Sequence, residues 1–199
     1  MTSQVSIINI GLIALGEPSI ISIDDATKPA RTMKALYEPM RDAELRKNRW
    51  SFAMKRVSLS ALSSAPDWGY DYQYQLPSDC LRLDMIKDSY VVPNLDNYRQ
   101  QEDLHYTVEG RRILTNEAAP LSIRHIYRVT DTNEFDALFA VALGKRLAFE
   151  ACETITQSSQ KKQIIMQEYT MALRDAVKVG AIEKPPVPLP DDSWMMGRL

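Results

Sequence analysis

Histidine is the side chain most often used for catalysis near neutral pH, and this chain has only two, His105 and His125. Each lies in a segment whose alternating apolar and polar residues predict a strand. Metal centres and histidine-activated nucleophiles require further ligands or partners close by. We therefore expect both histidines to be sheet-surface residues without a catalytic role.

Carboxylate pairs could carry out acid–base hydrolysis, as two carboxylates do in glycosidases. Asp24 with Asp25 and Glu150 with Glu153 are such pairs, but 26 acidic residues make neighbouring carboxylates common by chance. We expect Glu150 and Glu153 to face solvent or a subunit contact.

The other residues that could do chemistry form no recognisable site either. Cys80 and Cys152 are far apart in the sequence and match no metal-ligand spacing, so we expect two reduced, packed thiols. The seven glycines are too dispersed to form a phosphate-binding loop. The sequence predicts no catalytic residue, metal or cofactor, and we expect a protein that is not an enzyme.

Aromatic residues gather between positions 68 and 74, where Trp68, Tyr70 and Tyr72 alternate with polar or small residues. Such a loop could stack against sugars or bases, or it could contact another protein. The residue types alone leave both interpretations open.

The formal net charge of −2 argues against electrostatic binding of nucleic acid by the chain as a whole. One segment departs from this balance, because residues 28–49 contain seven basic and three acidic residues. The segment is either a solvated helix face or a contact with an acidic neighbouring subunit or nucleic acid.

No basic region precedes an apolar run near the N-terminus, and the apolar stretches are too short to span a membrane. We expect a soluble protein made in the cytosol.

Two helices are expected in the first part of the chain. Residues 5–16 have helical apolar spacing, with Thr2 or Ser3 as the N-cap and Gly16 at the end. A second helix should begin near Thr27 and run towards position 49. Pro39 falls inside it and should kink or split it.

A β region is expected from about position 50 to 130. Residues 49–53 have the composition of a strand, and we expect Trp50 and Phe52 to fill the junction between the helices and the β region. Further on, residues 105–114 predict a hairpin with its turn at Glu109 and Gly110.

Helical pattern returns at Asp131, which forms a capping-box pattern with Glu134. The helix that follows is apolar nearly all round, so we expect it to be buried on most sides or shared with a neighbouring subunit. Ser158 and Ser159 should cap a last helix that ends at Gly180.

The sequence thus predicts an α+β fold, mainly α. Residues 1–49 and 131–180 form an antiparallel helical bundle, residues 50–130 an inserted small antiparallel β region, and residues 181–199 an extended C-terminal arm. The arm is rich in proline and carries an apolar cluster, so we expect it to dock elsewhere through Trp194, Met195 and Met196.

Four segments, in this order, resemble the tail tubular protein A family, the head-to-tail adaptors of short-tailed phages. They read LIALGEP at 12–18, LYEPMRDAELRKNRWSFA at 36–53, YQLPSDCLR at 74–82 and DTNEFDALFAVALGKRLAFEACETIT at 131–156. The resemblance covers most of the chain, from about residue 5 to 180. It departs from the family pattern at Gly144 and Cys152, where alanine or another small residue is expected.

The resemblance implies a non-enzymatic ring, a homo-oligomer with the dodecamer as its expected form. The ring would lie beneath the portal protein of the virion, continue the DNA channel without sequence-specific binding, and receive the tail nozzle and fibres. On this basis Trp194, Met195 and Met196 are candidates for the portal contact. Trp68, Tyr70 and Tyr72 are candidates for the nozzle or fibre contact, and Pro39, Trp50 and Phe52 for the junction of frame and insertion.

Two alternatives remain open on the sequence. One is a tail-associated cell-wall hydrolase that uses carboxylates near the aromatic loop. The other is a helical DNA-binding module that uses the basic segment 28–49.

Overall fold

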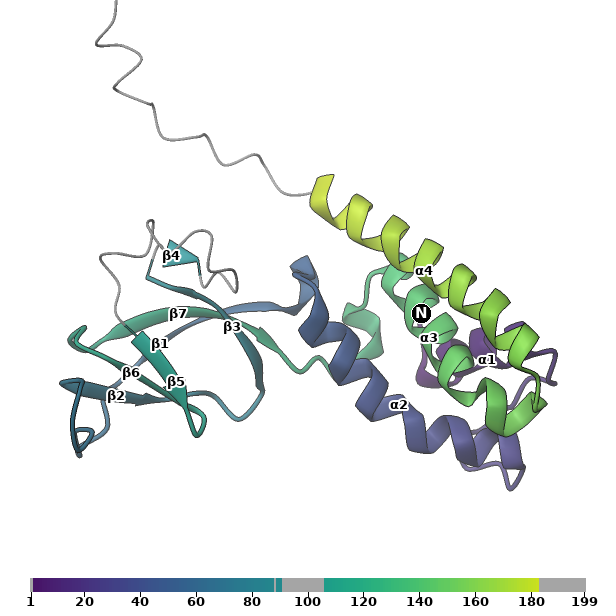
Figure 1. Cartoon of the computed structure of the whole chain (residues 1–199), viewed down its shortest axis with the longest axis horizontal. Helices are drawn as coiled ribbons and strands as arrows, with labels where there is room; N and C mark the ends of the chain where they lie inside the picture. Colours follow the sequence, from purple (N-terminus) through teal and green to yellow (C-terminus); the bar gives the residue numbers. More distant parts are fainter. Residues whose placement is uncertain (1, 88, 91–105, 183–199) are drawn as a thin grey trace, which may run out of the picture.

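The computed structural model describes residues 2–87, 89–90 and 106–182. Within them a helical part and a β part lie end to end (Figure 1). The helices are α1 (Gln4–Leu15), α2 (Lys28–Lys47), α3 (Ala137–Thr156) and α4 (Ser159–Ile182). The strands are β1 (Met54–Leu59), β2 (Tyr72–Gln75), β3 (Cys80–Ile86), β4 (Ser89–Tyr90), β5 (Tyr106–Glu109), β6 (Arg112–Thr115) and β7 (Leu121–Tyr127). The fold is α+β and mainly α, as the sequence predicted.

The first two helices begin where the sequence placed them. Ser3 and Ser6 form a reciprocal capping box at the start of α1, and Gly16 ends the helix with a φ of 76°. The Thr27 side chain caps α2.

Pro39 does not split α2, which runs unbroken through it. A proline removes the one hydrogen bond that its missing N–H would donate, here to the carbonyl of Ala35. Ala35 and Pro39 are both exposed, so water can reach that carbonyl. The bend remains a prediction, and the split is ruled out.

The third helix begins later than predicted. Asp131 caps only a short 3-10 turn (Thr132–Glu134), and α3 starts at Ala137. The carboxylate of Asp136 accepts from the backbone N–H groups of Leu138 and Phe139 and so provides the true N-cap.

The last helix begins as predicted, because the Ser158 hydroxyl accepts from the backbone N–H of Lys161. It does not stop at Gly180 but continues to Ile182. Glycine is common at helix C-termini but is also tolerated within a helix at a cost of about 1 kcal/mol relative to alanine.

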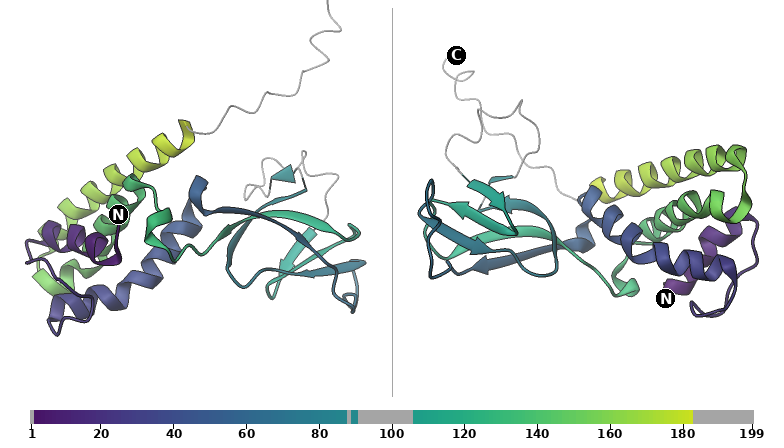
Figure 2. Two further views of the ribbon diagram at one scale, coloured as in Figure 1. Left: turned by 180° about the vertical axis from the view of Figure 1, so that it is seen from behind. Right: turned by 60° about the horizontal axis from the view of Figure 1, so that its bottom comes forward.

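The nearly all-apolar α3 is the central helix of the bundle. It packs against α1, α2 and α4, and the views in Figures 1 and 2 place it between α2 and α4. Its apolar circumference is therefore largely covered within one chain, and no neighbouring subunit is needed to explain it.

Two glycines allow α1 and α3 to approach closely. A Cβ added at Gly144 would lie 2.8 Å from the side chain of Ile10 and 2.9 Å from the carbonyl oxygen of Ile7. A Cβ at Gly11 would lie 2.8 Å from the carbonyl oxygen of Gly144. Close packing against α1 therefore favours glycine at position 144, because the Cβ of alanine would overlap atoms of α1.

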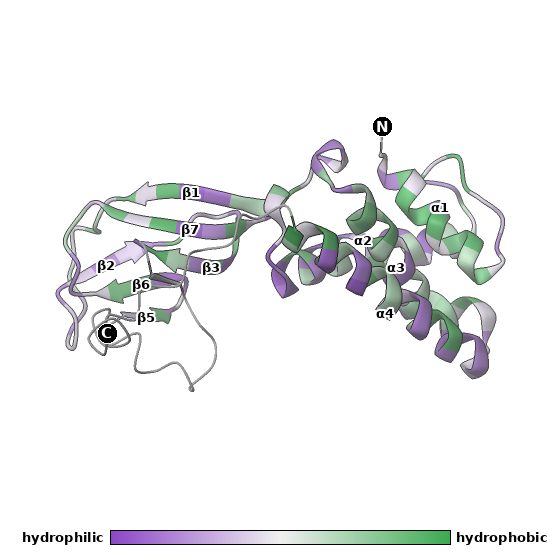
Figure 3. Ribbon diagram, turned by 90° about the horizontal axis from the view of Figure 1, so that it is seen from above, coloured by the Kyte–Doolittle hydropathy of each residue, from purple (hydrophilic) through white to green (hydrophobic). Residues whose placement is uncertain are grey.

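The β part consists of two antiparallel sheets, with strand orders β1-β7-β3-β4 and β2-β6-β5. They enclose a second core, separate from the helical one, that draws residues from β2, β3, β6 and β7. Tyr74, Ile113 and Leu121 are completely buried in it. Figure 3 shows this part extending away from the helices.

The hairpin of β5 and β6 turns one residue later than predicted. Glu109 pairs with Arg112, so the turn consists of Gly110 and Arg111. Both have positive φ, 51° and 63°, as a two-residue turn of the type favoured in hairpins requires. Arg111 is held in this conformation by hydrogen bonds from its guanidinium to the carbonyls of Pro77 and Ser78.

Candidate functional site

The junction between the two parts is an aromatic cluster. Trp50 lies 4.9 Å from Phe139, and Phe52 lies 5.8 Å from Phe135 and 5.1 Å from Phe139, between ring centroids. Residues 51–53 form a 3-10 turn, not the predicted strand, and β1 begins at Met54. Across this turn the rings of Trp50 and Phe52 both pack against Phe139 on α3.

Side chains from beyond α2 cap its C-terminal carbonyl groups. The indole Nε1 of Trp50 donates to the carbonyl of Glu44 at 2.9 Å, and the guanidinium of Arg82 donates to the carbonyl of Lys47 at 3.2 Å. The last carbonyls of a helix lack helical partners and carry partial negative charge. Trp50 and Arg82 therefore attach the β part to α2, whereas Pro39 is exposed in the middle of the helix and lies outside the aromatic cluster.

A buried ionic network connects three helices. The Tyr169 hydroxyl on α4 donates to Oε1 of Glu44 on α2 at 2.6 Å, and Nε of Arg146 on α3 lies 3.8 Å from the same oxygen. Burial and the hydrogen bond to Glu44 raise the pKa of Tyr169 well above its usual value. The network fixes the relative positions of the helices, and the phenol stays protonated.

His125 contradicts the prediction of a sheet-surface histidine, because it is completely buried. Its Nε2 lies 3.6 Å from a carboxylate oxygen of Asp79. Burial lowers the pKa of His125, although the charge of Asp79 acts in the opposite direction. The alternating pattern identified the strand correctly but could not tell which of its two faces was covered. His105 lies outside the described residues.

The carboxylate pairs noted in the sequence are engaged with basic or backbone groups. Glu150 pairs with Arg146 at 2.5 Å and Glu153 with Lys162 at 3.0 Å. Asp24 pairs with Lys34 at 2.5 Å, and Asp25 accepts from the backbone N–H of Ile21. Within residues 2–87, 89–90 and 106–182, no group of three or more histidine, cysteine or acidic side chains is arranged to hold a metal ion. Cys80 and Cys152 are both buried free thiols.

The aromatic loop lies at the end of the β part that is distant from the helices. Trp68 is 87% exposed and Tyr72 is 37% exposed. Tyr70 is half-buried, and its hydroxyl is hydrogen-bonded to the Thr107 side chain on β5 at 2.9 Å. Trp68 is therefore the most exposed of these aromatic side chains, and Tyr70 attaches the loop to the sheet.

An exposed apolar surface on α4 was not predicted from the sequence. Ile164, Met171 and Ile182 are 57%, 64% and 74% exposed, and their spacing places them on one side of the helix. We call this surface the α4 outer face. Figure 3 shows apolar positions interleaved with polar ones along α4. The buried side of α4 instead uses Ile165, Tyr169 and Ala176. The spacings of seven and eleven residues between Ile164, Met171 and Ile182 were the sequence signal that could have predicted this face.

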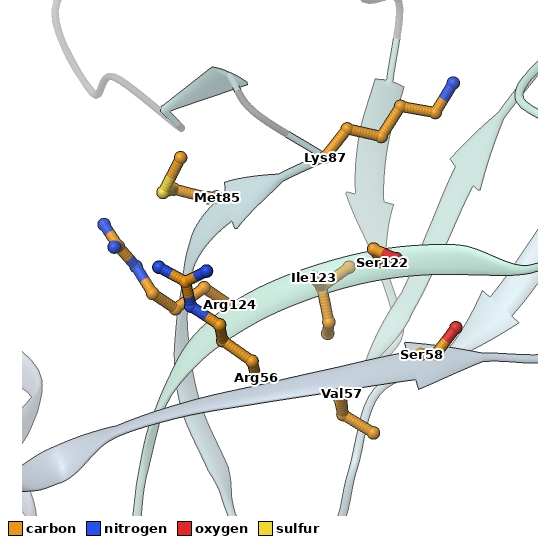
Figure 4. A pocket seen from close by; sticks show the side chains of 8 residues that line it. All are labelled: Arg56, Val57, Ser58, Met85, Lys87, Ser122, Ile123 and Arg124. Atoms are coloured by element: carbon orange, nitrogen blue, oxygen red, sulfur yellow. The ribbon is translucent and has the colours of Figure 1, made fainter.

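A hollow of about 580 Å³ lies on the outer side of the sheet that contains β1 and β7. Figure 4 shows Arg56 and Arg124 beside each other at one end of it and Lys87 at the other. Ser58 and Ser122 also line it, together with the apolar side chains of Val57, Met85 and Ile123, so its lining is mixed and includes three basic residues.

The candidate arm residues Trp194, Met195 and Met196 lie outside the described residues. No described helix is long and apolar enough to cross a membrane. No protein-family model matches the chain, and a search of curated proteins finds no match to it.

Proposed function

We propose that this protein is a structural head-to-tail adaptor of a short-tailed phage, as the resemblance to the tail tubular protein A family implies. The observation that best supports this is that the protein has two parts, each with its own hydrophobic core and with exposed apolar side chains. The helical part carries the α4 outer face, and the β part carries Trp68. A connector that forms a ring requires one surface for neighbouring copies and another for a partner protein.

The α4 outer face suits contact between neighbouring copies in a ring. Three large apolar side chains more than half exposed are costly to leave in water, and burial would stabilise each by up to roughly 1.5–3 kcal/mol. In a closed ring this surface packs against a different surface of the next copy. The dodecamer is the form that the family resemblance favours.

The same proposal assigns one partner to the helical end of the protein and another to the β end. The predicted arm, residues 181–199, begins at the last two residues of α4 and continues beyond them in the sequence, so Trp194, Met195 and Met196 are proposed to contact the portal protein. Trp68, with Tyr70 and Tyr72, is proposed to contact the nozzle or the tail fibres. The protein would be made in the host cytoplasm and reside at the head-to-tail interface of the virion, with DNA passing through without sequence-specific binding and with no cofactor or membrane involved.

The decisive experiment is co-expression with the portal protein of the same phage, followed by light scattering of the purified complex, with this chain alone as the control. A discrete assembly containing about one copy per portal subunit is expected. A chain that remains monomeric and does not bind the portal would refute the proposal.

Variants can separate the two contacts. Met171→Glu places a charge on the α4 outer face and should block ring assembly, while Gln163→Glu, an exposed position on another side of α4, should not. Truncation after Lys184 should abolish portal binding and leave the melting curve unchanged. Retained binding would remove the arm from the proposal.

The hydrolase alternative would use carboxylates near the aromatic loop, whereas Glu150 and Glu153 lie on α3 and pair with Arg146 and Lys162. A peptidoglycan zymogram would test it directly, and the adaptor should leave no cleared zone.

A further inference from the structure

Five arginines gather where α2 meets the β part. They come from four separate stretches of chain: Arg46 and Arg49 from α2 and the residues just after it, Arg56 from β1, Arg82 from β3 and Arg124 from β7. We call them the arginine cluster. Residues this far apart in the sequence are brought together only by the fold, so the composition of segment 28–49 indicated just part of this surface.

Asp84 is the carboxylate at the centre of the cluster. Its side chain is 1% exposed, and its two oxygens lie 2.6 Å from Arg49 and 2.6 Å from Arg124. A buried carboxylate between two guanidinium groups fixes their orientation. The single negative charge of Asp84 compensates at most part of the combined positive charge of Arg49 and Arg124.

Backbone carbonyls hold two further members of the cluster. Arg46 donates to the carbonyl of Leu81, and Arg82 donates to the carbonyl of Lys47. Burial lowers the pKa of Arg82, and the nearby charges of Arg49 and Arg46 lower it further, whereas Asp84 raises it. These arginines thus repel one another while remaining fixed in place.

Arg56 completes the cluster at the edge of the hollow. It lies directly across from Arg124 in the β1–β7 ladder, an arrangement of like charges that weakens a sheet. Arg56 is exposed and makes no ion pair with any residue in the described part of the chain. Figure 4 shows the two guanidinium groups close together above the strands.

We propose that the arginine cluster binds the phosphodiester backbone of DNA, independently of base sequence. Guanidinium groups present planar pairs of donors that match phosphate oxygens, and anchoring by Asp84 and backbone carbonyls reduces the entropy lost on binding. Phosphate contacts of this kind position a protein on DNA but carry no sequence information. An anion would also relieve the repulsion among Arg46, Arg49 and Arg82.

This surface differs from the DNA-binding helix considered on the sequence. Two basic residues of α2 are engaged with carboxylates, since Lys34 pairs with Asp24 and Arg41 is buried against Asp42. Only the C-terminal end of α2 contributes, and the sheet supplies the remaining arginines. The proposal does not depend on the adaptor assignment, because the isolated chain is the material tested.

Binding of a fluorescent DNA duplex to the full chain, measured over a range of salt concentrations, provides the test. Arg56→Gln removes a charge that no described residue pairs with, so folding should be unaffected. Its slope of log K against log salt should be about 0.9 smaller in magnitude than that of the wild type. Arg31→Gln, an exposed position near the other end of α2, is the matched control and should keep the wild-type slope.

Two duplexes of unrelated sequence should bind equally, and poly-glutamate of equal charge should bind more weakly. Absence of DNA binding at low salt, an unchanged slope in an Arg46→Gln/Arg56→Gln double variant with a wild-type melting curve, or stronger binding to poly-glutamate would each overturn the proposal. The last result would indicate an acidic protein as the partner.

Discussion

Replacing Trp50 tests whether the junction holds the two parts together. Trp50 is 4% exposed, packs edge-on against Phe139 and caps the carbonyl of Glu44. Trp50→Ala removes a buried aromatic side chain, for which we expect a loss of about 3–5 kcal/mol in the free energy of unfolding. For a chain of this size that loss corresponds to a fall in melting temperature of roughly 6–20 °C.

The matched variant Trp50→Phe divides this loss into its parts. It retains most of the ring packing but leaves the carbonyl of Glu44 without its indole donor, which should cost about 1–3 kcal/mol. Urea unfolding followed by circular dichroism at the helical band is the suitable assay, because removing a tryptophan alters the fluorescence signal itself.

Loss of less than about 1 kcal/mol in Trp50→Ala, smaller than a typical cavity cost, would show that the aromatic cluster does not secure the junction. An equal loss in Trp50→Phe and Trp50→Ala would instead assign the whole effect to the hydrogen bond. Either result would contradict the packing argument made from the ring distances.

Three further predictions concern buried residues outside the aromatic cluster. Gly144→Ala should destabilise the protein by about 1–3 kcal/mol, since the added Cβ would meet Ile10 and the carbonyl of Ile7. Gly180→Ala should be neutral or stabilising by up to about 1 kcal/mol, because no atom lies within 4 Å of the added Cβ. The midpoints of urea unfolding compare the two variants. Tyr169→Phe should cost about 1.5–3 kcal/mol, because it removes the hydroxyl that donates to the buried carboxylate of Glu44, and an unchanged midpoint would argue against the ionic network. The pKa of His125 is lowered in the folded state from its usual 6.5, so the unfolded chain binds more protons below about pH 7; stability should therefore fall as pH decreases through this range, and less so in His125→Gln, as measured by urea unfolding at several pH values.

Local signals predicted the starts of α1, α2 and α4 because each start depends on a few adjacent residues. Ser3, Thr27 and Ser158 cap their helices through side-chain contacts that span three positions, which a sequence displays directly. The β region was also recognisable from a change in periodicity between positions 50 and 130.

The errors arose where distant contacts decide between local options. Asp131 and Asp136 are both suitable caps, and the hydroxyl of Tyr127 binds Glu134 at 2.5 Å, so that residue takes no part in a capping box. Phe52 lies in the turn of residues 51–53, and its ring packs against Phe135 and Phe139, which lie more than eighty positions away. The burial of His125 and the assembly of the arginine cluster depend in the same way on how the sheets meet the helices.

Contacts between a channel and DNA would be expected to oppose the movement of DNA through it. The two proposals together remove this conflict. A single arginine cluster offers a few phosphate contacts, and each contributes a term that salt weakens strongly. In a ring built through the α4 outer face, the same cluster would recur once per copy, and simultaneous contacts would raise the total affinity without any base-specific interaction. Because phosphates repeat along the duplex, DNA could move from one set of contacts to the next while most of the others remain. On this reasoning, a charge-removing variant at Arg56 should weaken DNA binding by the ring far more than by the isolated chain.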